Sequence, residues 1–213
     1  MSRRAVTILL AAVAATSSGL VIAACGSSSQ AGSTTAAANG VKASYQAPSV
    51  ATPPKPAAPL QLRDSLGRLV DLRSFRGKAV LVTFIYTHCP DVCPLIVGNL
   101  HNAQAELGAR AKDLQIIAVS TDPRGDTPKT VARFLRQHNM TGRMDYLIGT
   151  KQQLGRVWKA WNIVAKPEKS DPERVEHSAL IYGLSGSGNV TTLYPANFKP
   201  AWIVHDVPLL AGH

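Results

Sequence analysis

The sequence lacks an apolar run long enough to cross a membrane, and its first 24 residues lack any acidic side chain. A membrane-spanning helix needs about 20 consecutive apolar residues, whereas the polar and small residues TSSG at 16–19 interrupt the apolar stretch here. Arg3 and Arg4 precede this stretch, which is the pattern of an export signal. We therefore predict that residues 1–24 are a signal peptide and not a transmembrane helix.

The predicted signal ends in IAAC, where small residues precede Cys25. This ending resembles the lipobox of bacterial lipoproteins, in which the cysteine is lipidated and becomes the new N-terminus. We expect a lipid on Cys25 to anchor the protein to the outer, extracytoplasmic face of the cell membrane.

Large apolar residues are scarce in residues 25–58, which are rich in serine, alanine and proline. A segment of this composition cannot bury a core. We predict that it consists of the lipidated cysteine and a flexible linker, and that one folded domain spans residues 59–213.

Acidic residues are also few: 13 Asp and Glu stand against 23 Lys and Arg, for a formal charge of +10. Removing residues 1–24 takes away two arginines and no acid, which leaves +8. The basic residues are scattered and nucleic acid is not a routine partner outside the cell, so we expect no nucleic-acid binding. The positive charge suits anionic lipid or an acidic partner instead.

Cysteine occurs only three times. If Cys25 carries the lipid, Cys89 and Cys93 have no other cysteine partner within the chain. A disulfide between them would close a very short loop and gain little chain entropy, so a structural clasp is the weakest explanation. A thiol redox pair and a pair of metal ligands both remain open.

The two cysteines follow a predicted buried strand. Residues 79–87, AVLVTFIYT, are nearly all apolar or β-branched, as in a central strand that is covered on both faces. An apolar stripe from Ile96 to Leu107 then predicts a helix. Cys89 should lie in the loop and Cys93 in the first helical turn, where backbone N–H groups and the helix dipole favour the thiolate.

Strand and helix patterns alternate along the rest of the domain. A short hairpin is predicted before the cysteine strand, and two further strand–helix pairs follow it. The chain ends in a β-hairpin and a helix in which Pro208 is a candidate break. This order predicts an α/β, thioredoxin-like fold with an N-terminal β-hairpin and a C-terminal β-hairpin plus helix.

His177 occupies a position that matters in this fold. Thioredoxins carry a C-x-x-C pair and a cis-proline that faces it from just before the penultimate strand. Here the spacing is C-x-x-x-C, and His177 precedes that strand. Two thiolates and one imidazole suit Cu(I), and Cu(II) with an added oxygen or water ligand, whereas structural zinc requires a fourth ligand.

Three stretches, FIYTHCPDVCP, STDPRGDTP and VEHSALIY, resemble motifs of the Sco/SenC family of thioredoxin-fold copper chaperones, which are anchored outside the membrane. The resemblance runs from about Pro59 to Leu210. It implies that Cys89, Cys93 and His177 bind copper, as Cu(I) or Cu(II). It also implies delivery of copper to the copper A centre on subunit II of cytochrome c oxidase.

An alternative function uses the same thiols. Cys89 and Cys93 would be the redox residues of a thiol-disulfide oxidoreductase that reduces the cysteines of the oxidase subunit or of another exported protein, with a thiol reductant as a further partner. Whether the protein is a metallochaperone or an enzyme stays open between these two hypotheses.

Two departures from the family motifs leave the proposed ligands unchanged, and the other polar residues near the site are predicted to have structural roles. Gly125 stands where the family motif has arginine and Glu176 where it has aspartate, and neither is a proposed ligand. Alternation at the strand end points His88 away from Cys89, so we predict a loop or supporting role for it. Asp122 is predicted to be a loop residue, and either Asp126 or Thr127 is predicted to be the N-cap of a helix that starts at Pro128.

Overall fold

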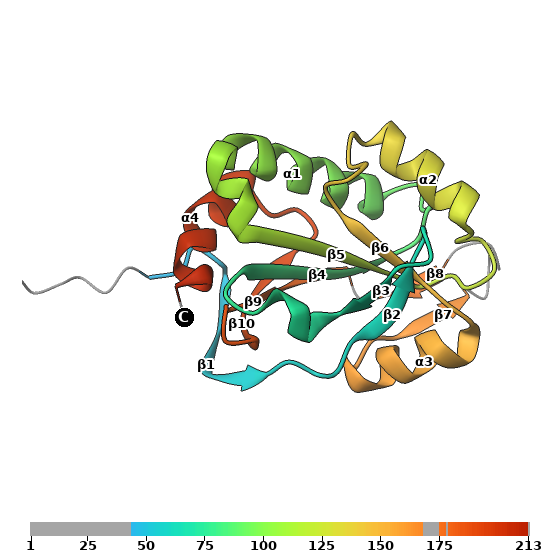
Figure 1. The fold of residues 1–213 in the computed structure, drawn as a ribbon, viewed down its shortest axis with the longest axis horizontal. Helices are drawn as coiled ribbons and strands as arrows, with labels where there is room; N and C mark the ends of the chain where they lie inside the picture. The colour runs from blue at the N-terminus through green and yellow to red at the C-terminus, as the bar shows by residue number, and fades with distance from the viewer. Residues whose placement is uncertain (1–43, 168–174, 178, 213) are drawn as a thin grey trace, which may run out of the picture. The chain divides into compact units, whose positions relative to one another are not determined.

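The computed structural model describes residues 44–167, 175–177 and 179–212 (Figure 1). Cys25 and the predicted signal peptide lie outside the described residues. The chain divides into two units, residues 1–41 and 42–213, and the described residues all belong to the second. None of the helices in this described part is both long enough and apolar enough to cross a membrane.

The described residues form a mixed eight-stranded sheet in the order β1-β10-β9-β4-β5-β6-β2-β3 (Figure 1). Its strands are β1 (Ser49–Pro56), β2 (Gln61–Asp64), β3 (Leu69–Asp71), β4 (Ala79–Ile85), β5 (Leu114–Ser120), β6 (Asp145–Ile148), β9 (Leu180–Leu184) and β10 (Asn189–Pro195). The central strands β4, β5 and β6 are parallel, and the remaining pairings are antiparallel. Strands β7 (Ala165–Pro167) and β8 (Val175–His177) pair in a separate small sheet.

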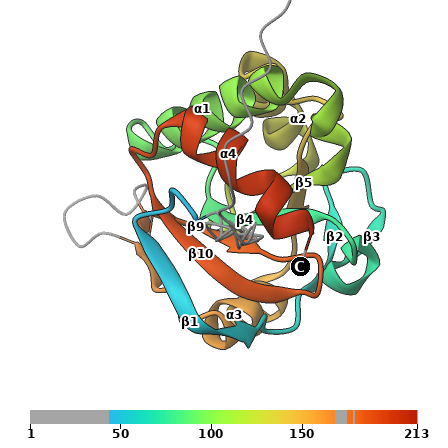
Figure 2. The same cartoon turned by 90° about the vertical axis from the view of Figure 1, so that its left-hand side faces the viewer.

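Helices cover both faces of the large sheet (Figures 1 and 2). Helices α1 (Val92–Leu107), α2 (Pro128–Gln137) and α4 (Pro200–Ala211) pack on one face, and α3 (Lys151–Ala160) packs on the other. Strand β4 is buried along its whole length and sends Leu81 and Ile85 to the first face and Val82 and Phe84 to the second. Two short 3₁₀ helices, η1 (Leu72–Phe75) and η2 (Gly108–Asp113), complete the described helical segments.

This architecture confirms the predicted thioredoxin-like fold. The N-terminal hairpin is β2–β3, the cysteine strand is β4, and the C-terminal hairpin and helix are β9–β10 and α4. The expected break at Pro208 is wrong, because α4 continues to Ala211 and the Gly212 N–H donates to the Pro208 carbonyl at 3.2 Å.

The predicted linker ends earlier than the sequence indicates. Strand β1 lies inside the range 25–58, where it pairs with β10 from Ser49↔Leu193 to Pro56↔Asn189. Most side chains of β1 are exposed, so composition carries no sign of burial. An edge strand tolerates proline because one side of its backbone faces away from the sheet, and a Pro-rich segment can therefore join the sheet without contributing to the core.

A buried carboxylate attaches the segment that leads into β1. Asp206 of α4 is fully buried and accepts hydrogen bonds from the backbone N–H groups of Gln46 and Ala47 at 2.7 and 2.9 Å. The Tyr194 hydroxyl of β10 donates to the same carboxylate at 2.9 Å, and His205 Nδ1 lies 2.8 Å from it. One side chain thus joins residues 46–47 to both α4 and β10.

We predict that Asp206→Ala releases this segment. Three donors would lose their acceptor at about 1–3 kcal/mol each, so the free energy of unfolding should fall by roughly 3 kcal/mol or more. Hydrogen exchange at the Gln46 and Ala47 amides should accelerate more than exchange in β4. His205→Ala is the matched control, since it removes only a partly exposed partner, and unchanged amide protection in Asp206→Ala would contradict the assignment.

Candidate functional site

The cysteines meet where β4 gives way to α1. Cys89 lies in the connecting loop and Cys93 is the second residue of α1, with exposed fractions of 7% and 0%. The Cys93 backbone N–H donates to Cys89 Sγ at 3.4 Å, and the Cys89 N–H donates to the Tyr86 carbonyl at 3.4 Å. The structure therefore brings the two residues together at the strand–helix junction that the sequence predicts.

The pKa of Cys93 is raised, whereas the sequence predicts that the helix start favours its thiolate. A hydrogen bond with the Cys89 side chain, burial, and repulsion from a negative charge on Cys89 all raise the pKa of the Cys93 thiol. The expected stabilisation of the thiolate at the helix start is outweighed at Cys93 by the hydrogen bond with Cys89 and by burial. A metal that binds both sulfurs must therefore displace the proton of Cys93.

Asp126 holds the start of the cysteine loop through a hydrogen bond. Its carboxylate is 5% exposed and accepts from the Thr87 backbone N–H at 2.9 Å, from Ser120 Oγ at 2.6 Å and from the Tyr146 hydroxyl at 3.0 Å. These three donors come from the carboxyl ends of β4 and β5 and from β6. The residue two positions before Cys89 is thus fastened to the neighbouring strands.

Of the two predicted N-cap candidates, Thr127 is confirmed and Asp126 is wrong. Thr127 is the N-cap of α2, where its hydroxyl accepts from the Thr130 N–H at 3.2 Å in a capping box. Asp126 points inward instead. A signal for this was present: Thr127-Pro128 is already a complete helix start, which leaves the preceding aspartate without a capping task.

His88 contacts the same β5–α2 loop. Its Nε2 lies 3.2 Å from Asp122 Oδ2, and its ring packs edge-on against Tyr86 with centroids 5.1 Å apart. The Arg124 N–H donates to the other Asp122 oxygen at 3.0 Å. The predicted supporting role of His88 agrees with this contact, whereas Asp122 does more than the predicted loop residue because it receives the imidazole.

His177 is described only through its backbone. It is the last residue of β8 and pairs with Ala165 of β7. Its side chain lies outside what the structure describes, so its approach to the cysteines stays a prediction. Among the side chains that are described, no three or more His, Cys, Asp or Glu gather closely enough to hold a metal ion.

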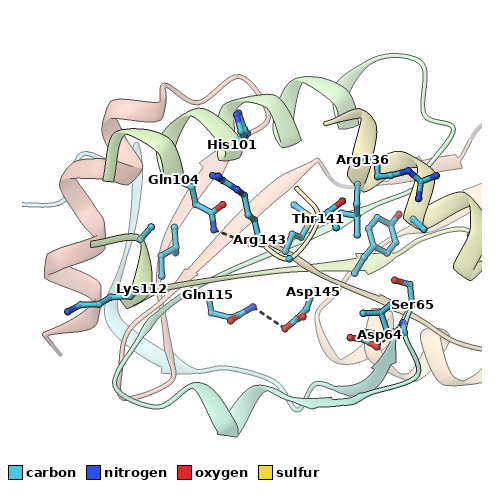
Figure 3. A pocket seen from close by; sticks show the side chains of 18 of the residues that line it. Asp64, Ser65, His101, Gln104, Lys112, Gln115, Arg136, Thr141, Arg143 and Asp145 are labelled. Carbon is cyan, nitrogen blue, oxygen red and sulfur yellow. Dashed lines mark hydrogen bonds between the residues drawn. The ribbon is translucent and has the colours of Figure 1, made fainter. Parts of the chain in front are cut away.

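A large hollow of about 1050 Å³ lies away from this site (Figure 3). Lys112, Gln115 and Arg143 are among its lining residues, and Gln104 on α1 donates to the Arg143 carbonyl at 3.0 Å. It includes the start of β5, and because β4 and β5 are parallel this is the opposite end of the sheet from the cysteines. The chemistry of Cys89 and Cys93 therefore belongs to the strand ends and not to this hollow.

We predict a distinct pH dependence from Asp126. Burial raises the pKa of this carboxyl, although hydrogen bonds from Ser120 and Thr87 oppose the shift. A raised pKa means that the folded state binds the proton more tightly than the unfolded state, so ionisation lowers stability as the pH rises from the unfolded pKa to the folded pKa.

Asp126→Asn removes this contribution while keeping an acceptor for Thr87. The free energy of unfolding of the variant minus that of the wild type should therefore increase as the pH rises above about 4. Denaturant titrations of both proteins between pH 3 and pH 7 measure the difference, and a constant or decreasing difference contradicts the assignment.

Known proteins are similar to this chain in sequence. The model of the SCO1/SenC protein family matches residues 50–211. A SCO1 protein homolog of Bacillus subtilis (strain 168) is 31% identical over 142 residues, which covers 64% of this chain and 72% of the relative. The chain spans only about half the length of mitochondrial relatives such as the SCO2 homolog of Bos taurus, at 51%.

Solved structures share its fold. ScoI of Bradyrhizobium japonicum with copper bound has a TM-score of 0.65 at 30% identity, over 72% of this chain and 98% of that one. BsSco, a member of the Sco family of cytochrome c oxidase assembly proteins in which a disulfide switch is identified, has a TM-score of 0.62 at 26% identity, over 75% and 95%. With a family match over most of its length and the thioredoxin-like Sco fold, this chain belongs to the SCO1/SenC family.

Proposed function

We propose that this protein binds copper through Cys89, Cys93 and His177 and delivers it to the copper A centre on subunit II of cytochrome c oxidase. The observation that carries the proposal is the contact between the cysteines, with the Cys93 N–H 3.4 Å from Cys89 Sγ at the start of α1. Copper is the cargo in this proposal, and the protein holds and releases it without turnover.

The donor set suits this cargo. Two neighbouring sulfurs in an apolar environment favour a soft ion such as Cu(I), and an imidazole from His177 would complete a three-coordinate set. Cys93 belongs to the same apolar cluster as Ile96 and Val97, which keeps water from its sulfur. The copper-bound relative and the relative from a family of oxidase assembly proteins support both the cargo and the recipient.

The chain's own residues have separate tasks in this cycle. Cys93 gives up its proton when the metal arrives, because its thiol is protonated beforehand. Asp126 holds Thr87 and so keeps the loop in place during exchange. Release proceeds when a ligand of the recipient replaces the imidazole of His177, which leaves the two sulfurs to be exchanged in turn.

The proposed location outside the cell membrane is based on the predicted signal peptide and on Cys25. A lipid on Cys25 would hold the domain at the outer face of the membrane. The strand β1 shortens the free tether, since the chain is joined to the domain from Gln46 onward. A net positive charge would favour anionic lipid or an acidic face on the recipient.

A thiol-disulfide oxidoreductase is the second candidate, and the proximity of the two cysteines, with the Cys93 N–H donating to Cys89 Sγ at 3.4 Å, favours it. The Cys89 thiolate would attack a partner disulfide, form a mixed disulfide and expel one partner thiolate, which takes up a proton. Cys93 would then lose its proton and attack Cys89 Sγ, forming the Cys89–Cys93 disulfide and releasing the second partner thiol. An external thiol reductant would restore the pair.

We predict that copper binding requires all three proposed ligands. In the reduced full-length chain, Cys89→Ala and Cys93→Ala should weaken Cu(I) affinity by more than about 100-fold, because even residues that only orient ligands cost about 10- to 100-fold. His177→Ala should cost at least about 10-fold on the same scale. Competition with a chromogenic Cu(I) chelator measures these affinities.

The matched control is His138→Ala, which removes an imidazole at the C-terminal end of α2 that packs on Phe134. It should bind copper like the wild type. If Cys89→Ala, Cys93→Ala and His177→Ala also bind like the wild type, the proposed site is wrong.

A separate prediction decides between metal transfer and thiol chemistry. If the protein is an oxidoreductase, Cys93→Ala should trap a mixed disulfide with a partner through Cys89, and His177→Ala should keep its thiol-exchange rate within about threefold, since the imidazole takes no part in the exchange. Reduction of a disulfide-containing peptide from the oxidase subunit, followed by mass spectrometry, tests this. Absence of exchange by the wild type would eliminate the second candidate.

A further inference from the structure

Gly125 lies against the imidazole of His88 on the β5–α2 loop. A Cβ atom added at Gly125 would overlap His88 Cε1 and Asp122 Oδ2, and it would lie 3.0 Å from His88 Nδ1. The side chain of His88 therefore occupies the space that any other residue at position 125 would need.

Backbone conformation does not explain this glycine. Among the described residues, the glycines with positive φ are Gly67, Gly77, Gly108, Gly142 and Gly188, and Gly125 is not one of them. Alanine could adopt its backbone, so what position 125 supplies is the space for His88.

The contacts of His88 belong to a continuous chain of hydrogen bonds and close contacts. Its Nε2 meets Asp122 at 3.2 Å, and the Asp122 N–H donates to Ser120 Oγ at 3.1 Å. Ser120 Oγ in turn donates to Asp126, which accepts from the Thr87 N–H. The two residues before Cys89 are thus both fastened to the β5–α2 loop, one by its backbone and one by its side chain.

We propose that His88 is a positioning residue that holds Cys89 in place, and that Gly125 supplies the space in which its imidazole lies; the inference rests on the proposed function of Cys89. Both ring nitrogens face the 122–125 loop, so His88 acts through the backbone and not as a ligand. The Cys89 N–H donates to the Tyr86 carbonyl at 3.4 Å, and the ring of Tyr86 packs against that of His88, so His88 contacts the same turn.

The test compares His88→Ala, Gly125→Ala and their double variant in the full-length chain. The histidine is 43% exposed, so a methyl group at position 125 can displace it from Asp122 without disturbing the core. Gly155→Ala is the matched control: it is the same change on α3, where an added Cβ meets nothing within 4 Å.

His88→Ala and Gly125→Ala should each weaken Cu(I) affinity by about tenfold, the lower end for residues that orient metal ligands. The double variant should also lose about tenfold and not the product of the two, because both changes remove one and the same contact. His88→Gln should stay within about threefold of the wild type, since its amide can still donate to Asp122. Thermal midpoints of His88→Ala and Gly125→Ala should stay close to that of the wild type.

A metal-free measurement accompanies these affinities. In the reduced protein, backbone amide order parameters of residues 87–89 should fall in His88→Ala and Gly125→Ala and stay unchanged in Gly155→Ala. If Gly125→Ala fails to fold, Asp122→Ala must reproduce the effect of His88→Ala from the other side of the contact.

Three results would overturn the positioning role: Gly125→Ala equal to Gly155→Ala, multiplicative losses in the double variant, or His88→Gln as weak as His88→Ala, which would make the imidazole itself a ligand. Failure of the proposed function is recognised separately, because Cys89→Ala would then keep its copper affinity while the order parameters still report on His88.

Discussion

The site depends on the hydrogen bonds that the Asp126 carboxylate accepts. This carboxylate joins the Thr87 N–H beyond β4, the Ser120 hydroxyl at the end of β5 and the Tyr146 hydroxyl of β6, all within 3.0 Å. Parallel strands end in loops that the sheet itself does not hold together. One buried acceptor with three donors ties these ends to each other, and the loop that carries Cys89 begins directly from this point.

Burial of that carboxylate has a cost that the surroundings offset. Removing a charge from water is unfavourable unless hydrogen bonds replace its hydration. Three donors supply that replacement, yet burial still raises the pKa of Asp126. A hydrogen bond with Cys89 and burial together raise the pKa of Cys93, which lies among apolar side chains of α1 and β4. Burial thus encloses both cysteines and favours the protonated form of Cys93.

A second buried carboxylate performs a comparable task at the other end of the described chain. Asp206 accepts from Gln46, Ala47 and Tyr194, so the segment before β1 is held to α4 and β10. Together with the pairing of β1 and β10, this contact sets where the domain begins.

Local patterns in the sequence determined the order of strands and helices, because apolar periodicity and turn residues act over a few positions. The buried strand before Cys89, the helix beginning near Cys93 and the two hairpins were all predictable in this way. Other features needed the tertiary structure. Strand β1 has no burial pattern because most of its side chains are exposed. It is held by β10, about 140 residues later in the chain, and no local pattern predicts that pairing. Asp126 and Asp122 serve Thr87 and His88, more than 30 residues earlier, and such polar partners are chosen by where the fold places them. The raised pKa of Cys93 likewise needed the tertiary structure, because the contact with Cys89 and the burial of the thiol both depend on how the loop and α1 fold.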